Sequence, residues 1–361
     1  MKRGLVVLDP LDVALEEYTR RVGALQDRLR AIGCGLGLIY GDVYRSGDIT
    51  YLTNLCLYWN EGILAVPPEG MPVFLTKLSP RVHPWMRSIS TVGDLRSGQD
   101  LAALVEAVAA EHPGGSVGLV EEMWWPAPLV EAVRKRLVDR PVRDLGSVVR
   151  GLRRRPSEAE RQLLRQSARL AATAVAVAAS TPGERSERVA AAEREVRSAG
   201  VRDVVLWWDP GPGRGWSIEV LVDWRGYWAH AARTVLEDRA RLEAGERFAE
   251  AYRRATTTLR AGVQIRQVEA EVRAWLGSRP DERWSVDVVE HVDLETRGEH
   301  RLPQVRDEPL AEGTVVSLEL RLWGPDGTRW VAADTYEVYR DGVRWLTDRL
   351  PPDPVVRVEG G

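Results

Sequence analysis

The chain has 361 residues, enough for two domains with sizeable hydrophobic cores. Its 50 Lys and Arg residues nearly balance its 53 Asp and Glu residues, so a net charge of −3 provides no long-range attraction to nucleic acid or to anionic membranes. Its apolar runs are far shorter than the ~20 residues of a membrane-spanning helix, and its first residues carry too many acids for a signal peptide.

The first 150 residues alternate helical and strand patterns. Apolar residues at helical spacing predict helices over residues 12–32, 101–110 and 129–137. Short apolar runs bounded by turn residues predict strands at 36–40, 49–52, 63–66, 73–75 and 117–120. This alternation predicts an α/β domain over residues 1–150. The chain has only two cysteines, Cys34 and Cys56, which favours reduced thiols and a cytoplasmic protein.

A second domain is predicted over residues 151–361. It begins where Pro156 breaks the preceding structure, Ser157 can cap a helix and Glu160 completes a capping box. Four helices are predicted, each long one followed by a shorter one: 157–179, 188–198, 240–259 and 265–276. Because each pair precedes strand-rich sequence, the pattern indicates an internal duplication.

A β-hairpin is predicted over Trp216–Thr234. Apolar and polar residues alternate along its first strand, and a turn with Gly226 precedes the return strand. Glu219 and Asp223 share one face of the first strand, and His230 and Arg233 follow on the return. These polar residues either face solvent on a surface hairpin or form the floor of an active site.

Three segments resemble the creatinase, aminopeptidase P and methionine aminopeptidase family. They are Gly226–Thr234 (GYWAHAART), Leu310–Glu319 (LAEGTVVSLE) and the pair Asp334-Thr335, which occur in the family's order. Thr50–Asn54 is similar to a strand of the family's N-terminal domain. The resemblance implies an α/β (α+β) protein, with a creatinase-like N-terminal domain and a C-terminal pita-bread domain that contains a pseudo-twofold repeat.

The same resemblance implies that the usual dinuclear metal site is broken. Metal enzymes of this family hold two ions with Asp, Asp, His, Glu and Glu side chains. The matching positions in this chain are Glu219 (or Asp223), His230, Asp293, Glu319 and Ala333. Ala333 offers no ligand atom, and an acid stands where the family has its metal-binding His. We therefore expect no cofactor, and the alternative is a single divalent ion held by Glu219, His230, Asp293 and Glu319.

Without metal, the resemblance leaves His230, His300 and Glu319 as catalytic candidates. A buried imidazole beside a carboxylate can act as an acid/base pair near neutral pH. The alternative for each His is a structural, hydrogen-bonded ring. The residues expected to contact substrate are Trp208, Glu219, Asp223, Trp228, Arg233, Asp293 and Asp334. Tryptophans cluster around the hairpin, where they fill the core, contact the partner in a dimer or line a pocket for a flat or apolar substrate.

The predicted function is cleavage of a C–N bond in a small molecule by acid/base chemistry. One alternative keeps the fold but makes the protein a lyase, cyclase or isomerase in a specialised biosynthetic pathway. Another is a non-catalytic binding module. The family resemblance and the many apolar and Trp residues also predict a homodimer, with no nucleic-acid or membrane partner.

Overall fold

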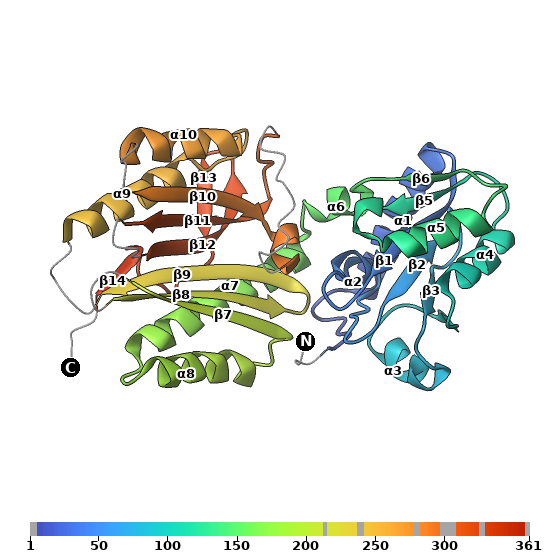
Figure 1. The fold of residues 1–361 in the computed structure, drawn as a ribbon, viewed down its shortest axis with the longest axis horizontal. Coiled ribbons are helices and arrows are strands. Elements are labelled where there is room, and N and C mark those ends of the chain that lie inside the picture. The colour runs from blue at the N-terminus through green and yellow to red at the C-terminus, as the bar shows by residue number, and fades with distance from the viewer. Residues whose placement is uncertain are drawn as a thin grey trace. The chain divides into compact units, whose positions relative to one another are not determined.

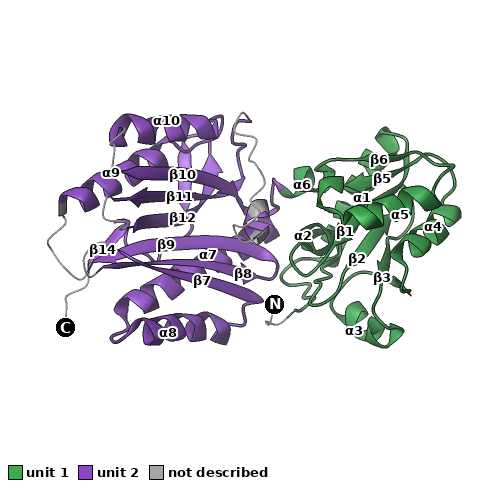
Figure 2. Ribbon diagram, in the orientation of Figure 1, with its two compact units in different colours: residues 1–153 green, residues 154–361 purple. Residues whose placement is uncertain are grey.

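The chain forms two compact units, Met1–Arg153 and Arg154–Gly361, in a computed structural model (Figure 2). The structure describes residues 6–211, 215–236, 242–277, 282–296, 308–324 and 329–357. The expected division at residue 150 lies within the last helix of the first unit, α6 (Val148–Arg153). Among the described residues, no helix is long and apolar enough to cross a membrane.

The first unit is a six-stranded sheet in the order β4-β3-β2-β1-β5-β6 (Figure 1). Its strands are β1 (Cys34–Gly41), β2 (Gly62–Val66), β3 (Val73–Thr76), β4 (Asp94–Ser97), β5 (Ser116–Val120) and β6 (Val142–Asp144). Its other helices are α1 (Leu15–Ala31), α2 (Gly47–Thr53), α3 (His83–Ser88), α4 (Leu101–Glu111) and α5 (Ala127–Arg136), with short 3-10 turns η1 (Pro80–Val82) and η2 (Glu122–Trp124). Because α1, α2, α3 and α6 pack on one face and α4 and α5 on the other, the unit has three layers.

The strand predicted at residues 49–52 is wrong, because these residues lie in helix α2. Ile49 and Leu52 are three positions apart, and both are buried against α1 in the same core. Asn54 ends the helix in the left-handed conformation. A run of four apolar residues fits a strand and a buried helix turn equally well, so tertiary packing decided the outcome.

The second unit contains the predicted duplication. The segment α7-α8-β7-β8-β9 is followed by α9-α10-β10-β11-β12. The sheet order β10-β11-β12-β9-β8-β7 places the two halves side by side in one sheet, with β12 next to β9 (Figure 1). The helices are α7 (Glu158–Ser180), α8 (Arg185–Ser198), α9 (Leu242–Thr258) and α10 (Ile265–Leu276), with a 3-10 segment η3 (His291–Thr296). The strands are β7 (Asp203–Pro210), β8 (Trp216–Trp224), β9 (Tyr227–Leu236), β10 (Arg283–Glu290), β11 (Val315–Trp323), β12 (Arg329–Tyr339), β13 (Gly342–Trp345) and β14 (Val355–Arg357).

The start of α7 follows the predicted capping box. The backbone N–H of Glu160 donates to the Ser157 hydroxyl at 3.3 Å, and the backbone N–H of Ser157 donates to the Glu160 carboxylate at 2.9 Å. These bonds satisfy two N–H groups that a helix start otherwise leaves without partners. The helix therefore begins where the sequence places it.

All four long helices of the second unit cover the same face of its sheet. Ile218 and Val220 of β8 face α7 and α8, and Leu318 and Leu320 of β11 face α9 and α10. Successive strand residues point to opposite faces. Glu219 and Glu319 therefore project from the face that these helices leave uncovered.

Two threonines join the halves of the duplicated sheet. The hydroxyl of Thr335 accepts from the His230 N–H at 3.0 Å and donates to the His230 carbonyl at 2.9 Å. The hydroxyl of Thr234 accepts from the Val331 N–H at 2.7 Å and donates to the Val331 carbonyl at 3.0 Å. Each strand contributes one threonine, as a twofold repeat requires. These side chains take the place of ladder hydrogen bonds between β9 and β12.

Candidate functional site

The candidate site begins as one row of residues across the uncovered face of the second sheet. Glu219 lies opposite Ala232, which lies opposite Ala333. Ala333 in turn lies opposite Glu319, and Glu319 lies opposite Asp287. Directly paired residues share a face of the sheet. Two alanines therefore separate two glutamates, and His230 is two positions from Ala232 on the same face.

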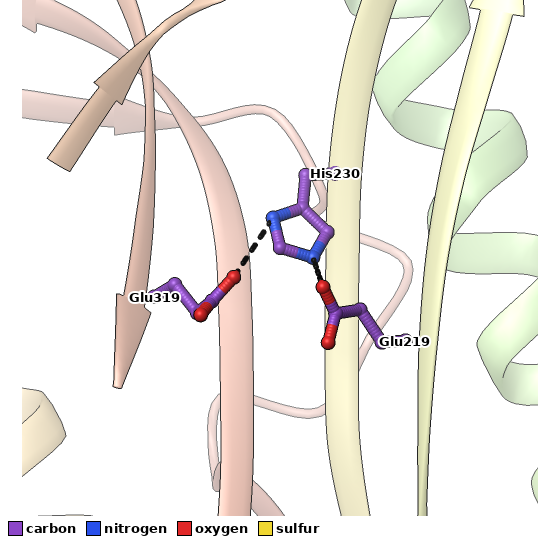
Figure 3. Close-up of side chains that lie close together, drawn as sticks. All are labelled: Glu219, His230 and Glu319. Carbon is purple, nitrogen blue, oxygen red and sulfur yellow. Dashed lines mark ion pairs between the residues drawn. The ribbon is translucent and has the colours of Figure 1, made fainter. Parts of the chain in front are cut away.

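His230 lies between the two glutamates (Figure 3). Its Nε2 atom is 3.2 Å from Glu219 Oε1, and its Nδ1 atom is 3.8 Å from Glu319 Oε2. Nδ1 also lies within hydrogen-bonding distance, 2.9 Å, of the Ser317 hydroxyl. The exposed fractions of His230, Glu219 and Glu319 are 1%, 5% and 1%. The three side chains thus form a buried cluster from three strands.

Two arginines border this cluster. Arg321 Nη2 lies 3.0 and 2.9 Å from the two carboxylate oxygens of Glu219, and Arg321 Nη1 makes a close ion pair with Glu319. Arg329 Nη2 is 3.7 Å from Glu219 Oε2, and Arg329 Nη1 pairs closely with Asp209. The cluster therefore contains positive charge supplied by the chain itself.

These neighbours set the ionisation of the cluster. Burial alone would raise the pKa of Glu219, but the interactions with His230 and Arg321 outweigh it and hold the pKa well below its usual range. Burial alone would lower the pKa of Arg321, but the charges of Glu319 and Glu219 raise it above its ordinary value. Glu219 is thus a carboxylate and Arg321 a cation throughout the neutral pH range.

The described residues do not fit the family's dinuclear metal centre. Ala333, which the motif resemblance aligns with one ligand position, is fully buried and has no donor atom. Glu219, His230 and Glu319 each offer one ligand atom, and these atoms lie within 4.8 Å of one another. However, the guanidinium of Arg321 contacts both carboxylates. A cation of the chain thus already pairs with both carboxylates of this set.

The strand register separates the two adjacent tryptophans. Trp208 pairs with Ile218, stacks on Trp216 at a ring distance of 3.9 Å and packs, partly buried, against the core under the helices. Trp207 pairs with Glu219 and therefore shares its face. The structure brings Trp207 rather than Trp208 to the side of the cluster.

Asp223 and Trp228 lie at the closed end of the hairpin, and they pair with each other. Asp223 accepts from the Gly226 N–H at 2.7 Å and from Arg202 Nε at 2.7 Å, so its carboxylate stabilises the turn. Trp228 is buried beside Leu221 and η3. The structure does not bring the Asp223 carboxylate into the Glu219–His230–Glu319 cluster.

Arg233 and Asp334 alternate with the cluster residues and point to the helix-covered face. Arg233 Nη2 donates to Asp334 Oδ1 at 3.0 Å, and the Tyr252 hydroxyl of α9 donates to Asp334 Oδ2 at 2.9 Å. Both members of the pair are buried. They are equivalent positions in the duplicated halves, each preceding one of the bridging threonines. The structure places them in a structural ion pair behind the sheet.

Two predicted residues cannot be compared with the cluster. Asp293 lies in the short segment η3, but its side chain is outside the described residues. His300 falls in the stretch 297–307, which is also outside the described residues. Their predicted contacts with substrate and their catalytic role remain predictions.

Ser317 and Arg321 are cluster residues that the sequence patterns did not single out. Both lie on β11, at positions two before and two after Glu319. A spacing of two places side chains on the same face of a strand. The spacing of two could have identified both residues from the sequence, because a polar residue two positions from Glu319 on the same strand lies on the same face of the sheet.

Comparison with known proteins agrees with this fold. The sequence profile of metallopeptidase family M24 matches residues 162–348. The X-Pro aminopeptidase from Thermotoga maritima superposes with a TM-score of 0.79 at 16% identity, over 93% of this chain and 99% of that one. Dipeptidase PepE from Mycobacterium ulcerans gives a TM-score of 0.70 at 21% identity, over 95% and 99%. The N-terminal domain of the FACT complex subunit SPT16 from Cicer arietinum gives 0.67 at 12% identity, also over 95% and 99%. No curated protein sequence matches the chain significantly.

The predicted fold and family resemblance are confirmed by these matches. They cover the α/β unit as well as the duplicated unit, because the solved structures align over more than nine-tenths of the chain. At these identities the structural likeness establishes the pita-bread architecture alone. The reaction has to be argued from the cluster.

Proposed function

The chain belongs to metallopeptidase family M24, and from that premise we propose that it is a hydrolase that cleaves an amide, amidine or peptide C–N bond in a small molecule. We propose further that it does so without the family's pair of metal ions. The observation that carries the proposal is the His230 imidazole held between two buried carboxylates, at 3.2 Å from Glu219 and 3.8 Å from Glu319.

The proposed chemistry is general acid/base catalysis. Water adds to the carbonyl or amidine carbon while His230 takes up its proton, and Glu219 stays ionised beside the ring because its pKa lies well below the usual range. The same proton then moves to the departing nitrogen, the C–N bond breaks, and an amine leaves. Glu319, whose Oε2 atom lies 3.8 Å from Nδ1, faces the imidazolium that forms in between with a negative charge.

Arg321 lies on the side of the cluster that a substrate would approach. Its side chain is 18% exposed, more than those of Glu219 and Glu319. A fixed guanidinium next to Glu219 can stabilise the negative charge that develops on a substrate oxygen. We therefore propose that the substrate contacts Arg321 and Glu219, and that His230, which is more deeply buried, accepts and returns the proton.

Ser317 is better assigned to holding the imidazole than to attacking the substrate. The order hydroxyl, imidazole, carboxylate is the arrangement found in serine hydrolases. However, Ser317 is fully buried in the middle of β11, where its hydroxyl lies against His230 Nδ1. A hydroxyl with no exposed surface offers a substrate carbon no direct approach.

A non-catalytic binding module is the second candidate. It is favoured by the burial of all three cluster residues and by the ion pairs that already neutralise both carboxylates. Such a protein would bind its ligand at the rim of the cluster and release it unchanged. Calorimetric binding without any product would support this candidate over the hydrolase.

The test is hydrolysis by chelator-treated protein in ¹⁸O-labelled water. A panel of dipeptides, N-acyl amino acids and amidines is followed by mass spectrometry. We expect the acyl or amidine-derived product to carry ¹⁸O, which a lyase or cyclase would not introduce. His230→Ala should lower turnover by ~10²–10⁴-fold, whereas His112→Ala in the first unit should not. Activity that requires added divalent ions, or that survives His230→Ala, would refute the proposal.

A further inference from the structure

Two buried carboxylates on one sheet face need a nearby cation. Glu219 and Glu319 are almost fully buried and converge on the same point. Burying a carboxylate without a partner is costly, because the protein interior replaces water poorly. The described structure supplies this cation from β11 itself, since Arg321 lies two residues after Glu319 and on the same face.

The guanidinium of Arg321 contacts both carboxylates at once. One nitrogen lies 3.0 and 2.9 Å from the two oxygens of Glu219, and the other nitrogen pairs closely with Glu319. Arginine remains protonated at every physiological pH. The cluster therefore has a cation that is covalently part of the chain, unlike a bound ion.

Apart from the arginine, the cluster consists of side chains that commonly bind metal ions. Glu219, His230 and Glu319 each have a ligand atom within 4.8 Å of the others. His230 Nε2 is buried and lies 3.2 Å from Glu219 Oε1, so a ring nitrogen and a carboxylate oxygen face each other. Nitrogen and carboxylate donors in this number suit Zn²⁺, Co²⁺ or Mn²⁺. The two carboxylate charges together equal the charge of one divalent ion.

We propose that Arg321 is the built-in counter-ion of this cluster and that it excludes a divalent metal ion from a latent site formed by Glu219, His230 and Glu319. Removing the guanidinium leaves two negative charges and an imidazole nitrogen next to the position that the guanidinium occupied. A divalent ion then restores the balance of charge. This inference concerns metal binding and holds whichever reaction the cluster performs.

Arg329 provides a matched control. It is also an arginine beside Glu219, at 3.7 Å, but its close ion pair is with Asp209. If any loss of positive charge were sufficient, Arg329→Gln would create the same metal affinity as Arg321→Gln. If the position between both carboxylates matters, only Arg321→Gln will do so.

The experiment measures Co²⁺ and Zn²⁺ binding to the full-length protein. Visible absorption of Co²⁺, calorimetry and elemental analysis after dialysis are compared for wild type, Arg321→Gln, Arg329→Gln and the double variant Arg321→Gln/Glu319→Gln. We expect Arg321→Gln to bind about one ion per chain. Its affinity should exceed that of wild type by at least ~100-fold, given the strength of unit charges about 4 Å apart near a protein surface. Arg329→Gln and the double variant should bind as weakly as wild type.

Each outcome decides the question. A folded Arg321→Gln variant that binds no ion overturns the proposal while leaving the metal-free hydrolase intact. Tight stoichiometric binding by the wild type overturns both. If Arg321→Gln does not fold alone, refolding with Co²⁺ or Zn²⁺ should restore its circular dichroism spectrum, and failure with both ions also overturns the proposal.

Discussion

Replacing Asp334 by Ala is expected to destabilise the second unit strongly. The Asp334 carboxylate accepts from Arg233 at 3.0 Å, from the Tyr252 hydroxyl at 2.9 Å and from the Thr347 hydroxyl. Arg233 is fully buried and donates further to the Pro351 carbonyl at 3.2 Å. Without Asp334, a buried guanidinium keeps its charge but loses its counter-ion.

The expected loss follows from that uncompensated charge. Removing one partner of a buried ion pair typically costs about 3–5 kcal/mol in the free energy of unfolding. For a unit of this size, each kcal/mol lowers the melting temperature by about 2–4 °C, so the shift should be about 6–20 °C. The double variant Arg233→Met/Asp334→Leu should regain most of the loss, because apolar side chains can replace such a pair.

Urea unfolding followed by circular dichroism measures these free energies, and calorimetry resolves the transition of each unit. Asp341→Ala is the control, since Asp341 is exposed in the turn after β12 and should change stability little. The reasoning fails if Asp334→Ala lies within about 1 kcal/mol of wild type. It also fails if the double variant is less stable than Asp334→Ala alone.

Three further outcomes are expected. The pKa of folded Glu219 lies below its ordinary value of 4.5, so its contribution to stability is complete above pH 4.5 and is lost as the pH falls through the folded pKa. Glu219→Gln should therefore flatten the acidic part of a curve of unfolding free energy against pH. An unchanged acidic part would contradict this. Ser317→Ala should cost about 1–3 kcal/mol in urea unfolding, since it leaves His230 Nδ1 buried without its hydroxyl partner at 2.9 Å; a loss near zero would count against that contact. Light scattering should give twice the chain mass of 40.4 kDa for a homodimer, and 40.4 kDa itself would exclude one.

The architecture of the second unit was accessible from local patterns. Helix periods, the capping box at Ser157 and the turn at Gly226 are all encoded within a few residues. Arg225 and Gly226 both have positive φ values, 57° and 98°, which a two-residue hairpin turn of this kind needs. The duplication was visible because each half repeats the same order of elements. These features do not depend on distant parts of the chain.

The direction of individual side chains was harder to predict. Trp207 and Trp208 are adjacent, and a shift of one residue in strand register exchanges the faces that they occupy. Arg233 and Asp334 are polar and lie in motif positions, yet their pairing behind the sheet joins strands of the two halves, and Tyr252 of helix α9 contacts Asp334 as well. Neither the register nor that helix contact can be read from one strand alone.

Arg321 was missed for a different reason. Arginine is abundant in this sequence, so one more on a strand carries little information. Its importance comes from contacts with Glu219, about one hundred residues earlier in the chain. Long-range contacts of this kind appear only when the sheet has brought β8 and β11 onto one face.

The threonine hydrogen bonds between β9 and β12 allow hydrogen exchange to measure how the two halves of the duplicated unit separate. The amides of His230 and Val331 donate to hydroxyl groups, at 3.0 and 2.7 Å, whereas amides between β8 and β9 donate to carbonyls within a ladder. Deuterium uptake at His230 and Val331 would therefore report separation of the two halves, and uptake along β8 would report the opening of one half. The amides of His230 on β9 and Val331 on β12 thus report on the contact between the halves, one amide from each half.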